Sequence, residues 1–169
     1  DIRIRRNGNA TESALFADAE LRLSDRLTAA AGARYYKTKL DYDRIIGVAD
    51  PGTAIPYATS DSGTTPKVSL RYAVDPALSV YVLASRGYRF GGISNVGFGT
   101  LAFPYKTDSL WNYEGGVRWT PSKNASLDVS VFRIDWKDVQ LATLANDPVS
   151  GLDFLVTGNI GKARSQGLE

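Results

Sequence analysis

Apolar and polar positions alternate most clearly in the stretch from Leu110 to Leu141. Between Trp111 and Trp119 the odd positions are apolar or glycine, whereas the even positions are polar, charged or glycine. Alternate residues of a strand point to opposite faces, so this pattern predicts a strand with one apolar and one polar face. Residues 121–124 (Pro-Ser-Lys-Asn) predict a tight turn. The apolar alternation resumes at Leu127, Val129 and Val131, which predicts a hairpin.

The first strand of this hairpin has the length and the ends of a membrane-crossing strand. A strand that crosses a bilayer needs roughly ten residues and carries aromatic side chains where it meets both interfaces. Trp111 and Trp119 stand at its two ends. A strand of a soluble sandwich is usually nearer five or six residues. The hairpin therefore favours a transmembrane β-barrel.

Four further segments show the same alternation, at 13–24, 27–42, 66–74 and 78–88. A helix over residues 14–36 is the competing interpretation, because Ala and Leu are strong helix formers. The apolar positions there recur at every second residue and not with helical spacing, so strands are favoured. Arg86 falls on the apolar side of its segment. A membrane tolerates it there only near an interface, where a long side chain can snorkel.

The predicted connections alternate in length along the chain. Short turns are predicted at about 25–26, 75–77 and 121–124, and long loops at about 43–65, 89–107 and 138–153. Outer-membrane barrels have short periplasmic turns and longer extracellular loops, so the alternation predicts which connections share a side of the membrane. About seven strands would leave two unpaired edges, which lipid does not tolerate. We therefore expect an all-β, antiparallel, up-and-down transmembrane barrel, of which residues 1–169 are a part.

The phase of the alternation becomes ambiguous after Val131. The even positions there are apolar (Phe132, Ile134, Trp136), whereas the odd positions are charged. A β-bulge near Val131 would shift the phase. Emergence of the strand from the membrane would give the same pattern without a bulge. The sequence leaves both explanations open.

Composition narrows the classes of function. The chain has no Cys and no His, so it offers no disulfide, thiolate zinc site, thiol nucleophile or imidazole base. Its net charge of +2 does not predict electrostatic binding to nucleic acid. We find no catalytic motif and no metal-ligand spacing, and so expect no enzyme activity, no cofactor and no metal site. The irregular spacing of its loop aspartates favours a solvated acidic surface over a Ca²⁺ site (Asp41, Asp43, Asp50, Asp61).

Several segments, taken in order, resemble a known family. YVLASRGYRFGGISN (81–95), DSLWNYEGGVRWTPSKNASLDVSVFRIDWKDVQL (108–141) and TGNIGKARSQGLE (157–169) resemble consecutive barrel segments of TonB-dependent outer-membrane receptors. ALFADAELRLSDRLTAAAGARYY (14–36) resembles an earlier hairpin of the same barrel. The resemblance weakens in the three predicted loops.

The resemblance implies a barrel of about 22 strands with a plugged lumen. Members import scarce nutrients, usually ferric siderophores, with energy from the inner-membrane TonB complex acting on an N-terminal plug. The chain contains neither plug nor TonB box, so we expect a middle-to-late piece of the barrel wall in a Gram-negative outer membrane. The expected partners are outer-membrane lipid, the receptor's own plug, the TonB complex through the N-terminal part, and a ferric siderophore or similar nutrient. Nucleic acid is not expected.

Alternation assigns two sets of candidate residues to opposite faces. The lumen-facing set could contact an anionic ligand or form the polar network that seats the plug, because arginine offers a bidentate fork to carboxylates and phosphates; its members are Arg34, Tyr36, Tyr81, Arg89, Glu114 and Arg118. The outward set is expected to form aromatic girdles at the two interfaces; its members are Tyr35, Tyr88, Trp111, Tyr113 and Trp119.

Two other functions fit parts of the sequence. A smaller porin or adhesin-type barrel would lack the plug and the dependence on TonB. A soluble carbohydrate-binding β-sandwich would use the surface aromatics for stacking on sugars. Our expected function remains TonB-dependent active transport of a scarce nutrient, with a ferric siderophore or similar iron complex as cargo.

Overall fold

The structure, a computed structural model, describes residues 3–47, 53–96, 101–146 and 151–169. Seven strands form one antiparallel sheet in the order β1-β2-β3-β4-β7-β8-β11. Its strands are β1 (Arg3–Arg22), β2 (Leu27–Gly47), β3 (Thr53–Ala73), β4 (Leu78–Arg89), β7 (Asp108–Ser122), β8 (Ala125–Lys137) and β11 (Lys162–Leu168). Two hairpins lie outside this sheet, formed by β5 (Gly92–Val96) with β6 (Leu101–Tyr105) and by β9 (Gln140–Asn146) with β10 (Asp153–Asn159).

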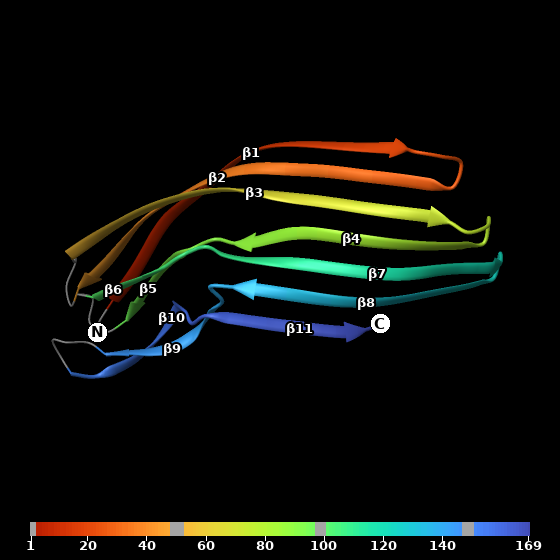
Figure 1. The fold of residues 1–169 in the computed structure, drawn as a ribbon. Helices are drawn as coiled ribbons and strands as arrows, with labels where there is room; N and C mark the ends of the chain where they lie inside the picture. The colour runs from red at the N-terminus through yellow and green to blue at the C-terminus, as the bar shows by residue number, and fades with distance from the viewer. Residues whose placement is uncertain (1–2, 48–52, 97–100, 147–150) are drawn as a thin grey trace.

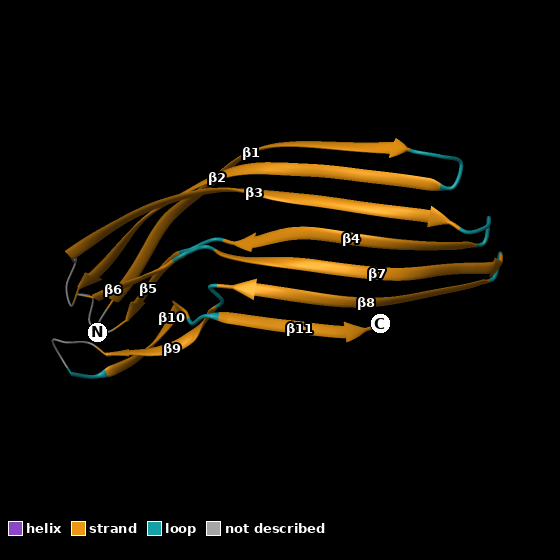
Figure 2. Ribbon diagram, viewed as in Figure 1, coloured by secondary structure: helices purple, strands orange, loops and turns teal. Residues whose placement is uncertain are grey.

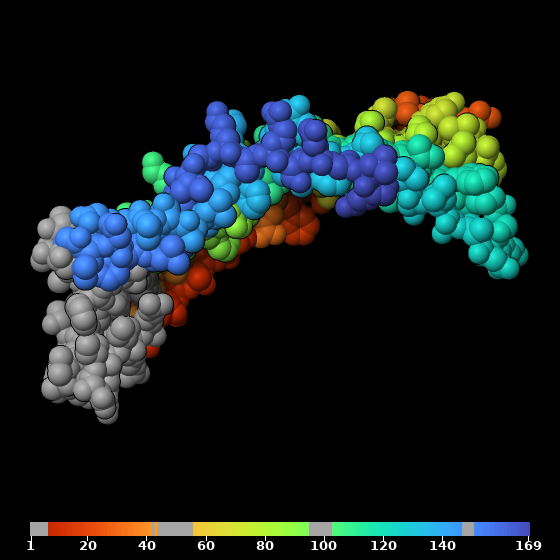
Figure 3. Space-filling view, turned by 90° about the horizontal axis from the view of Figure 1, so that it is seen from below, coloured from red at the N-terminus to blue at the C-terminus, as the bar shows by residue number. Residues whose placement is uncertain are grey.

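The seven-stranded sheet is a single layer whose strands run side by side (Figure 1). Short turns close one end of the sheet, and both small hairpins lie at the other end (Figure 2). In the view from below, the layer is curved like an arch (Figure 3). Twist and coiling of this kind allow a sheet to close into a barrel. The predicted all-β, antiparallel, up-and-down wall is confirmed.

The apolar face is the side of the sheet that carries the predicted apolar alternation. One cross-strand row on this face contains no polar side chain in any of the seven strands; it consists of Leu21, Ala29, Leu70, Val82, Gly115, Val131 and Leu168. The large side chains of this row are exposed, Leu21 by 62% and Val82 by 58%. A sandwich would cover such a face with a second sheet. The exposed apolar rows are those of a surface that faces lipid.

The polar face is the opposite side of the same strands. One cross-strand row there has a single large apolar side chain, Ile134, among its seven members; the row consists of Asp18, Gly32, Lys67, Ser85, Asn112, Ile134 and Ser165. The alternation read from the sequence thus separates the two faces of the sheet.

The phase after Val131 is resolved by the pairing of β7 with β8. The register is continuous from Ser109↔Lys137 to Trp119↔Leu127 and shifts between Trp119 and Ser122, at the turn. No bulge interrupts the described ladder near Val131. Arg133 therefore stays on the side of Val131, beyond the last apolar row. Emergence from the apolar band, and not a bulge, explains the change of pattern.

The described residues of the three predicted long loops are mostly strand, so the prediction of irregular loops was wrong there; residues 48–52, 97–100 and 147–150 of these loops lie outside the described residues. In place of a loop at 43–65, β2 and β3 remain paired as far as Ile46↔Thr53. In place of loops at 89–107 and 138–153 lie the hairpins β5–β6 and β9–β10. A hairpin with solvent on both faces satisfies its backbone by cross-strand hydrogen bonds and needs no apolar period. Such strands have the composition of a loop.

None of the described residues forms a helix that is long and apolar enough to cross a membrane. The few buried side chains among them lie where the small hairpins meet the sheet or close to that end: Tyr36, Asp108, Val139 and Val156. Most apolar surface is left uncovered by the chain itself.

Candidate ligand-binding face and cleft

Tyr81, Glu114 and Arg118 come together on the polar face of β4 and β7. The Tyr81 hydroxyl donates a hydrogen bond to Glu114 Oε1 at 2.5 Å, and the Arg118 guanidinium lies 5.2 Å from the centre of the Tyr81 ring. Arg118 also pairs with Asp128 at 3.2 Å. A Cβ at Gly116 would lie 2.6 Å from the Tyr81 ring, so a residue without a side chain lets the ring lie across β7.

A second glycine lies beneath an ion pair on the same face. Asp18, Gly32 and Lys67 are cross-strand neighbours on β1, β2 and β3. Lys67 Nζ lies 2.7 Å from Asp18 Oδ1, so the pair spans the intervening strand. A Cβ at Gly32 would lie 2.8 Å from Lys67 Cε. Both ions are about half exposed, so the pair organises the face more than it stabilises the fold.

Arg34 and Tyr36 belong to a third cluster farther from the short turns. Arg34 forms an ion pair with Glu12 of β1. Tyr36, only 5% exposed, stacks on Tyr88 with ring centroids 3.6 Å apart and planes 3° from parallel. Alternation had assigned these two rings to opposite faces, and Tyr88 to the outward girdle. That assignment of Tyr88 is wrong.

Tyr88 departs from the predicted face because β3 and β4 separate beside it. Pairing of β3 with β4 ends at Lys67↔Ser85, whereas β2 and β3 remain paired for many residues beyond this point. Where two strands diverge, a side chain can enter the space between them. The Tyr88 ring packs there against β2.

Arg89 takes part in a polar junction at the end of β4 nearest the small hairpins. We call this end of the sheet the upper end, and the end with the short turns the lower end. It forms an ion pair with Asp108, the first residue of β7, whose side chain is 1% exposed. The Gln140 backbone N–H donates to the same carboxylate at 3.1 Å, and the Arg89 guanidinium lies 4.4 Å from the Trp136 ring centroid.

Several groups determine the protonation of Asp108. Burial alone would raise the pKa of its carboxyl. Hydrogen bonds from Arg89 and Gln140, the nearby Trp136 indole and the Arg89 charge outweigh burial and hold that pKa below its ordinary value. The buried Trp136 N–H has no hydrogen bond of good geometry among the described residues, so its contribution is that of a nearby dipole. Asp108 is therefore charged at neutral pH.

Two amide side chains fasten the small hairpins to this junction. Gln140 Nε2 donates to the carbonyls of Phe90, at 2.8 Å, and Lys106, at 3.0 Å. Asn159 accepts a hydrogen bond from the Lys106 N–H at 2.6 Å and donates to the Asp138 carbonyl at 2.7 Å. Asp138, a non-glycine residue with φ of 55°, thereby has its carbonyl bonded.

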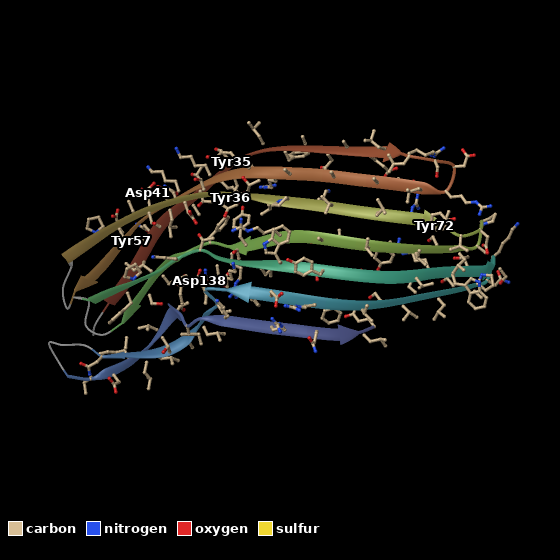
Figure 4. The ribbon with its side chains drawn as sticks, viewed as in Figure 1. Tyr35, Tyr36, Asp41, Tyr57, Tyr72 and Asp138 are labelled. Atoms are coloured by element: carbon tan, nitrogen blue, oxygen red, sulfur yellow. The ribbon has the colours of Figure 1, made fainter. Side chains whose placement is uncertain are left out.

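The parts of β1, β2 and β3 that lie farthest from the short turns form an extension of the sheet. A cleft of about 590 Å³ lies between this extension and the base of the β5–β6 hairpin. One wall includes Glu12, Thr38 and Asp61, and the other includes Phe90, Tyr105 and Lys106. Tyr57, also in its lining, is shown with Asp41 on the extension in Figure 4. A cleft of this volume is large enough for a small molecule. Aromatic, hydroxyl and charged groups converge on it.

Asp41 and Asp43 line a second, more open hollow. Among the described residues no three carboxylates come together as a metal site. Asp50, the remaining aspartate of the predicted acidic surface, lies outside the described residues.

The other four predicted girdle residues lie on the apolar face. Trp111 and Tyr113 stack with centroids 6.0 Å apart, and Trp119 is 46% exposed near the short turns. Tyr35 is 52% exposed on β2. Tyr72, omitted from the predicted set, lies on the same face near the short turns (Figure 4). The apolar rows run between these aromatic side chains.

The six predicted lumen-facing residues separate into the lower Tyr81 cluster and the upper Arg34 and Arg89 clusters. Sequence reasoning missed the partners of the upper clusters: Glu12, Asp108, Gln140 and Asn159. No local pattern marks these residues, because their contacts cross tens of positions in the chain. Glycine within a strand was an available signal for Gly32 and Gly116, since it often marks a close approach.

A family model described as TonB dependent receptor-like, beta-barrel, matches residues 2–169. Solved structures share the arrangement. The ferric yersiniabactin uptake receptor FyuA from Yersinia pestis superposes with a TM-score of 0.80 at 23% identity, over 99% of this chain and 24% of that one. The ferric-catecholate import receptor Fiu from E. coli K12 gives 0.68 at 18% identity, over 96% and 25% of the two chains.

The alcaligin outer membrane receptor FauA from Bordetella pertussis gives a TM-score of 0.64 at 12% identity, over 96% of this chain and 27% of that one. The chain thus spans about a quarter of the length of these three structures. At such identities the likeness establishes the fold of the wall.

Proposed function

Because the chain belongs to the TonB-dependent receptor-like β-barrel family, we propose that it forms part of the wall and mouth of an outer-membrane nutrient importer. The proposed cargo is a ferric siderophore or a similar iron complex. Receptors named for ferric yersiniabactin, ferric catecholates and alcaligin share its fold, which supports this class of cargo. The plug and the TonB complex are the proposed partners in the whole receptor.

The observation that carries the proposal is the cleft beside Phe90. It lies beyond the band of exposed apolar rows, at the end of the sheet that carries the small hairpins. In a receptor oriented with its short turns in the periplasm, this end faces the outside. A ligand there would contact the rings of Phe90 and Tyr105 and the charge of Lys106. The lower polar face, with Tyr81 and Arg118, would line the lumen below it.

Uptake by the full-length receptor tests the cargo. Cells that depend on this receptor would be given radioactive iron as catecholate, hydroxamate or mixed-ligand siderophore complexes. We expect TonB-dependent uptake of one class, and about tenfold weaker binding of that complex after combined Phe90→Ala and Lys106→Ala substitution, the loss of one aromatic contact and one charge. Phe16→Ala, at an exposed ring outside the cleft, is the matched control. Uptake that persists without TonB would instead favour a plug-less porin.

The orientation has its own test, since the region contains no cysteine. Single cysteines would replace Ala145 in β9 and Asn124 in the turn after β7, in a cysteine-free full-length receptor. A membrane-impermeant maleimide added to intact cells should label position 145 and not position 124. Equal labelling at both positions would contradict the proposed orientation.

A further inference from the structure

The β5–β6 hairpin joins the main sheet through a break in the cross-strand ladder. Pairing of β4 with β7 ends at Arg89↔Asp108, and pairing resumes at Gly92↔Tyr105 in the same register. Backbone groups that leave a ladder need other hydrogen-bond partners. We call the four residues between these pairs the ladder break: Phe90, Gly91, Lys106 and Thr107.

The neighbouring β9–β10 hairpin supplies partners for the ladder break. Gln140 Nε2 donates to the carbonyls of Phe90, at 2.8 Å, and Lys106, at 3.0 Å. Asn159 Oδ1 accepts from the Lys106 N–H at 2.6 Å, and Asn159 Nδ2 donates to the Lys106 carbonyl at 3.0 Å. Gln140 and Asn159 are themselves cross-strand partners, at the end of β9–β10 nearest the sheet. Their amides thus replace the cross-strand partners of the ladder break.

The β9–β10 hairpin can give this support because its own connection to the sheet keeps backbone hydrogen bonds. The Val139 N–H donates to the Gly161 carbonyl at 3.0 Å, and the Ile160 N–H donates to the Val139 carbonyl at 2.9 Å. Val139 is buried. Farther from the sheet, the Thr157 N–H donates to Ser94 Oγ of β5 at 2.7 Å. The β5–β6 hairpin is therefore held by β9–β10 at two levels.

The ladder break also forms part of one wall of the cleft. All four of its residues line the cleft, whereas none of the described residues of β9 or β10 does so. A binding wall that is already ordered lowers the entropy cost of binding. Gln140 and Asn159 can therefore change the affinity for a ligand that they do not touch.

We propose that Gln140 and Asn159 are positioning residues for the ligand of the cleft. They hold the backbone of the ladder break in the arrangement that presents Phe90 and Lys106 to the cleft. The β9–β10 hairpin thereby determines ligand affinity from outside the binding surface. This inference rests on the proposed function, because the ligand is the iron complex assigned to the cleft there.

Equilibrium binding to the full-length receptor tests the positioning role. The probes are iron complexes of a catecholate, a hydroxamate and a mixed-ligand siderophore, and quenching of tryptophan fluorescence gives the dissociation constant. Gln140→Met keeps the length of the side chain and removes its N–H donors, and Asn159→Ala removes the second amide. We expect each substitution to weaken binding about tenfold, because the ligand must then order the wall itself.

Asn146→Ala is the matched control for these two substitutions. This amide of β9 donates to the Gly151 carbonyl and to Asp153, so its hydrogen bonds lie within its own hairpin. We expect binding within about twofold of wild type, as for most surface substitutions.

A double-mutant cycle separates positioning from a general loss of stability. When Phe90→Ala and Lys106→Ala are already combined, Gln140→Met has no cleft side chain left to position and should weaken binding by less than about twofold. A substitution that only destabilised the barrel would weaken binding equally in both backgrounds. Hydrogen exchange of the β5 amides without any iron complex gives a second readout. Exchange should be faster in Gln140→Met and unchanged in Asn146→Ala.

Each outcome decides the proposal. Unchanged binding in Gln140→Met or Asn159→Ala, equal weakening in both backgrounds, or unchanged exchange of β5 in Gln140→Met would overturn it and leave the proposed cargo intact. Binding that does not respond to the combined Phe90 and Lys106 substitutions, or no binding of any of the three complexes, would overturn the proposed function and this inference together. A folding defect is excluded if Gln140→Met retains the heat-modifiable migration of the wild-type barrel.

Discussion

The two faces of the main sheet are made by the same strands but differ in what their side chains contact. On the polar face, charged side chains find partners within the sheet, as Lys67 does with Asp18 and Arg118 with Asp128. On the apolar face, one row of residues across the seven strands contains no polar side chain, and its large side chains are exposed. The ion pairs of the polar face are thus made inside the chain, whereas the large side chains of the apolar face are left uncovered by it.

This comparison shows what glycine does in each face. On the polar face, Gly32 and Gly116 make room for side chains that lie across a neighbouring strand. On the apolar face, Gly115 leaves a hollow. Glycine thus makes room for side chains of the same chain on the polar face, and leaves open space at the surface on the apolar face.

The largest expected effect comes from placing a charge on the apolar face. Val82→Arg in the full-length receptor should cost about 2 kcal/mol or more of folding free energy in a bilayer, because a cation on the lipid-facing side costs about 2–4 kcal/mol at the midplane and less towards an interface. The free energy of unfolding by urea from lipid vesicles would measure the loss. Leu83→Arg, at the next residue, faces the carboxylate of its cross-strand partner Glu114 and should change stability by less than about 0.5 kcal/mol. Equal losses would contradict the separation of the two faces.

A smaller effect is expected from removing a buried charge of the upper junction. Asp108→Asn should cost about 1–3 kcal/mol locally, because it removes the anion that Arg89 and the Gln140 N–H bind. Hydrogen exchange at β5–β6 and β9–β10 would report the faster opening. Asp128→Asn, at a 68% exposed carboxylate paired with Arg118, should have almost no effect on exchange. Matching increases in the two variants would refute a special role for the buried pair.

The same junction predicts a pH dependence. The folded-state pKa of Asp108 lies below the ordinary 3.8, so its contribution to stability is complete above that value. It is lost as the pH falls through the lower, folded-state pKa. Exchange at the small hairpins should therefore be constant from neutral pH to about 4 and, corrected for intrinsic rates, should rise below it. Asp108→Asn should remove this rise.

The smallest effect should distinguish adjacent glycines of β7. Gly116→Ala should cost about 1 kcal/mol or more, because its Cβ meets the Tyr81 ring at 2.6 Å and the ring must move. Gly115→Ala has its nearest atoms at 3.7 Å and should be neutral or slightly stabilising. Thermal unfolding of the two variants in the same detergent gives the comparison. A larger loss for Gly115→Ala would reverse the assignment of the faces.

Sequence alternation predicted the lower wall because lipid on one face and polar groups on the other impose a period of two. It failed for the part of β2 and β3 beyond the apolar rows, where solvent on both faces imposes no period of two although the backbones stay paired. Tyr88 was assigned to the wrong surroundings because β3 and β4 separate above Lys67 and Ser85. The junction of Asp108 with Gln140 was inaccessible to local patterns, since its partners meet only after the two hairpins fold.

The way in which the small hairpins join the sheet has a consequence for divergence among related receptors. β4 pairs with β7, and β8 with β11, although a hairpin intervenes in the chain each time. Gln140 and Asn159 bind backbone groups at the base of these hairpins, so the register of the wall does not depend on the hairpin tips. Insertions and substitutions in the tips can accumulate under selection while the scaffold stays constant. If the proposed function holds, exchanging one hairpin between receptors would change the ligand contacts and keep the wall.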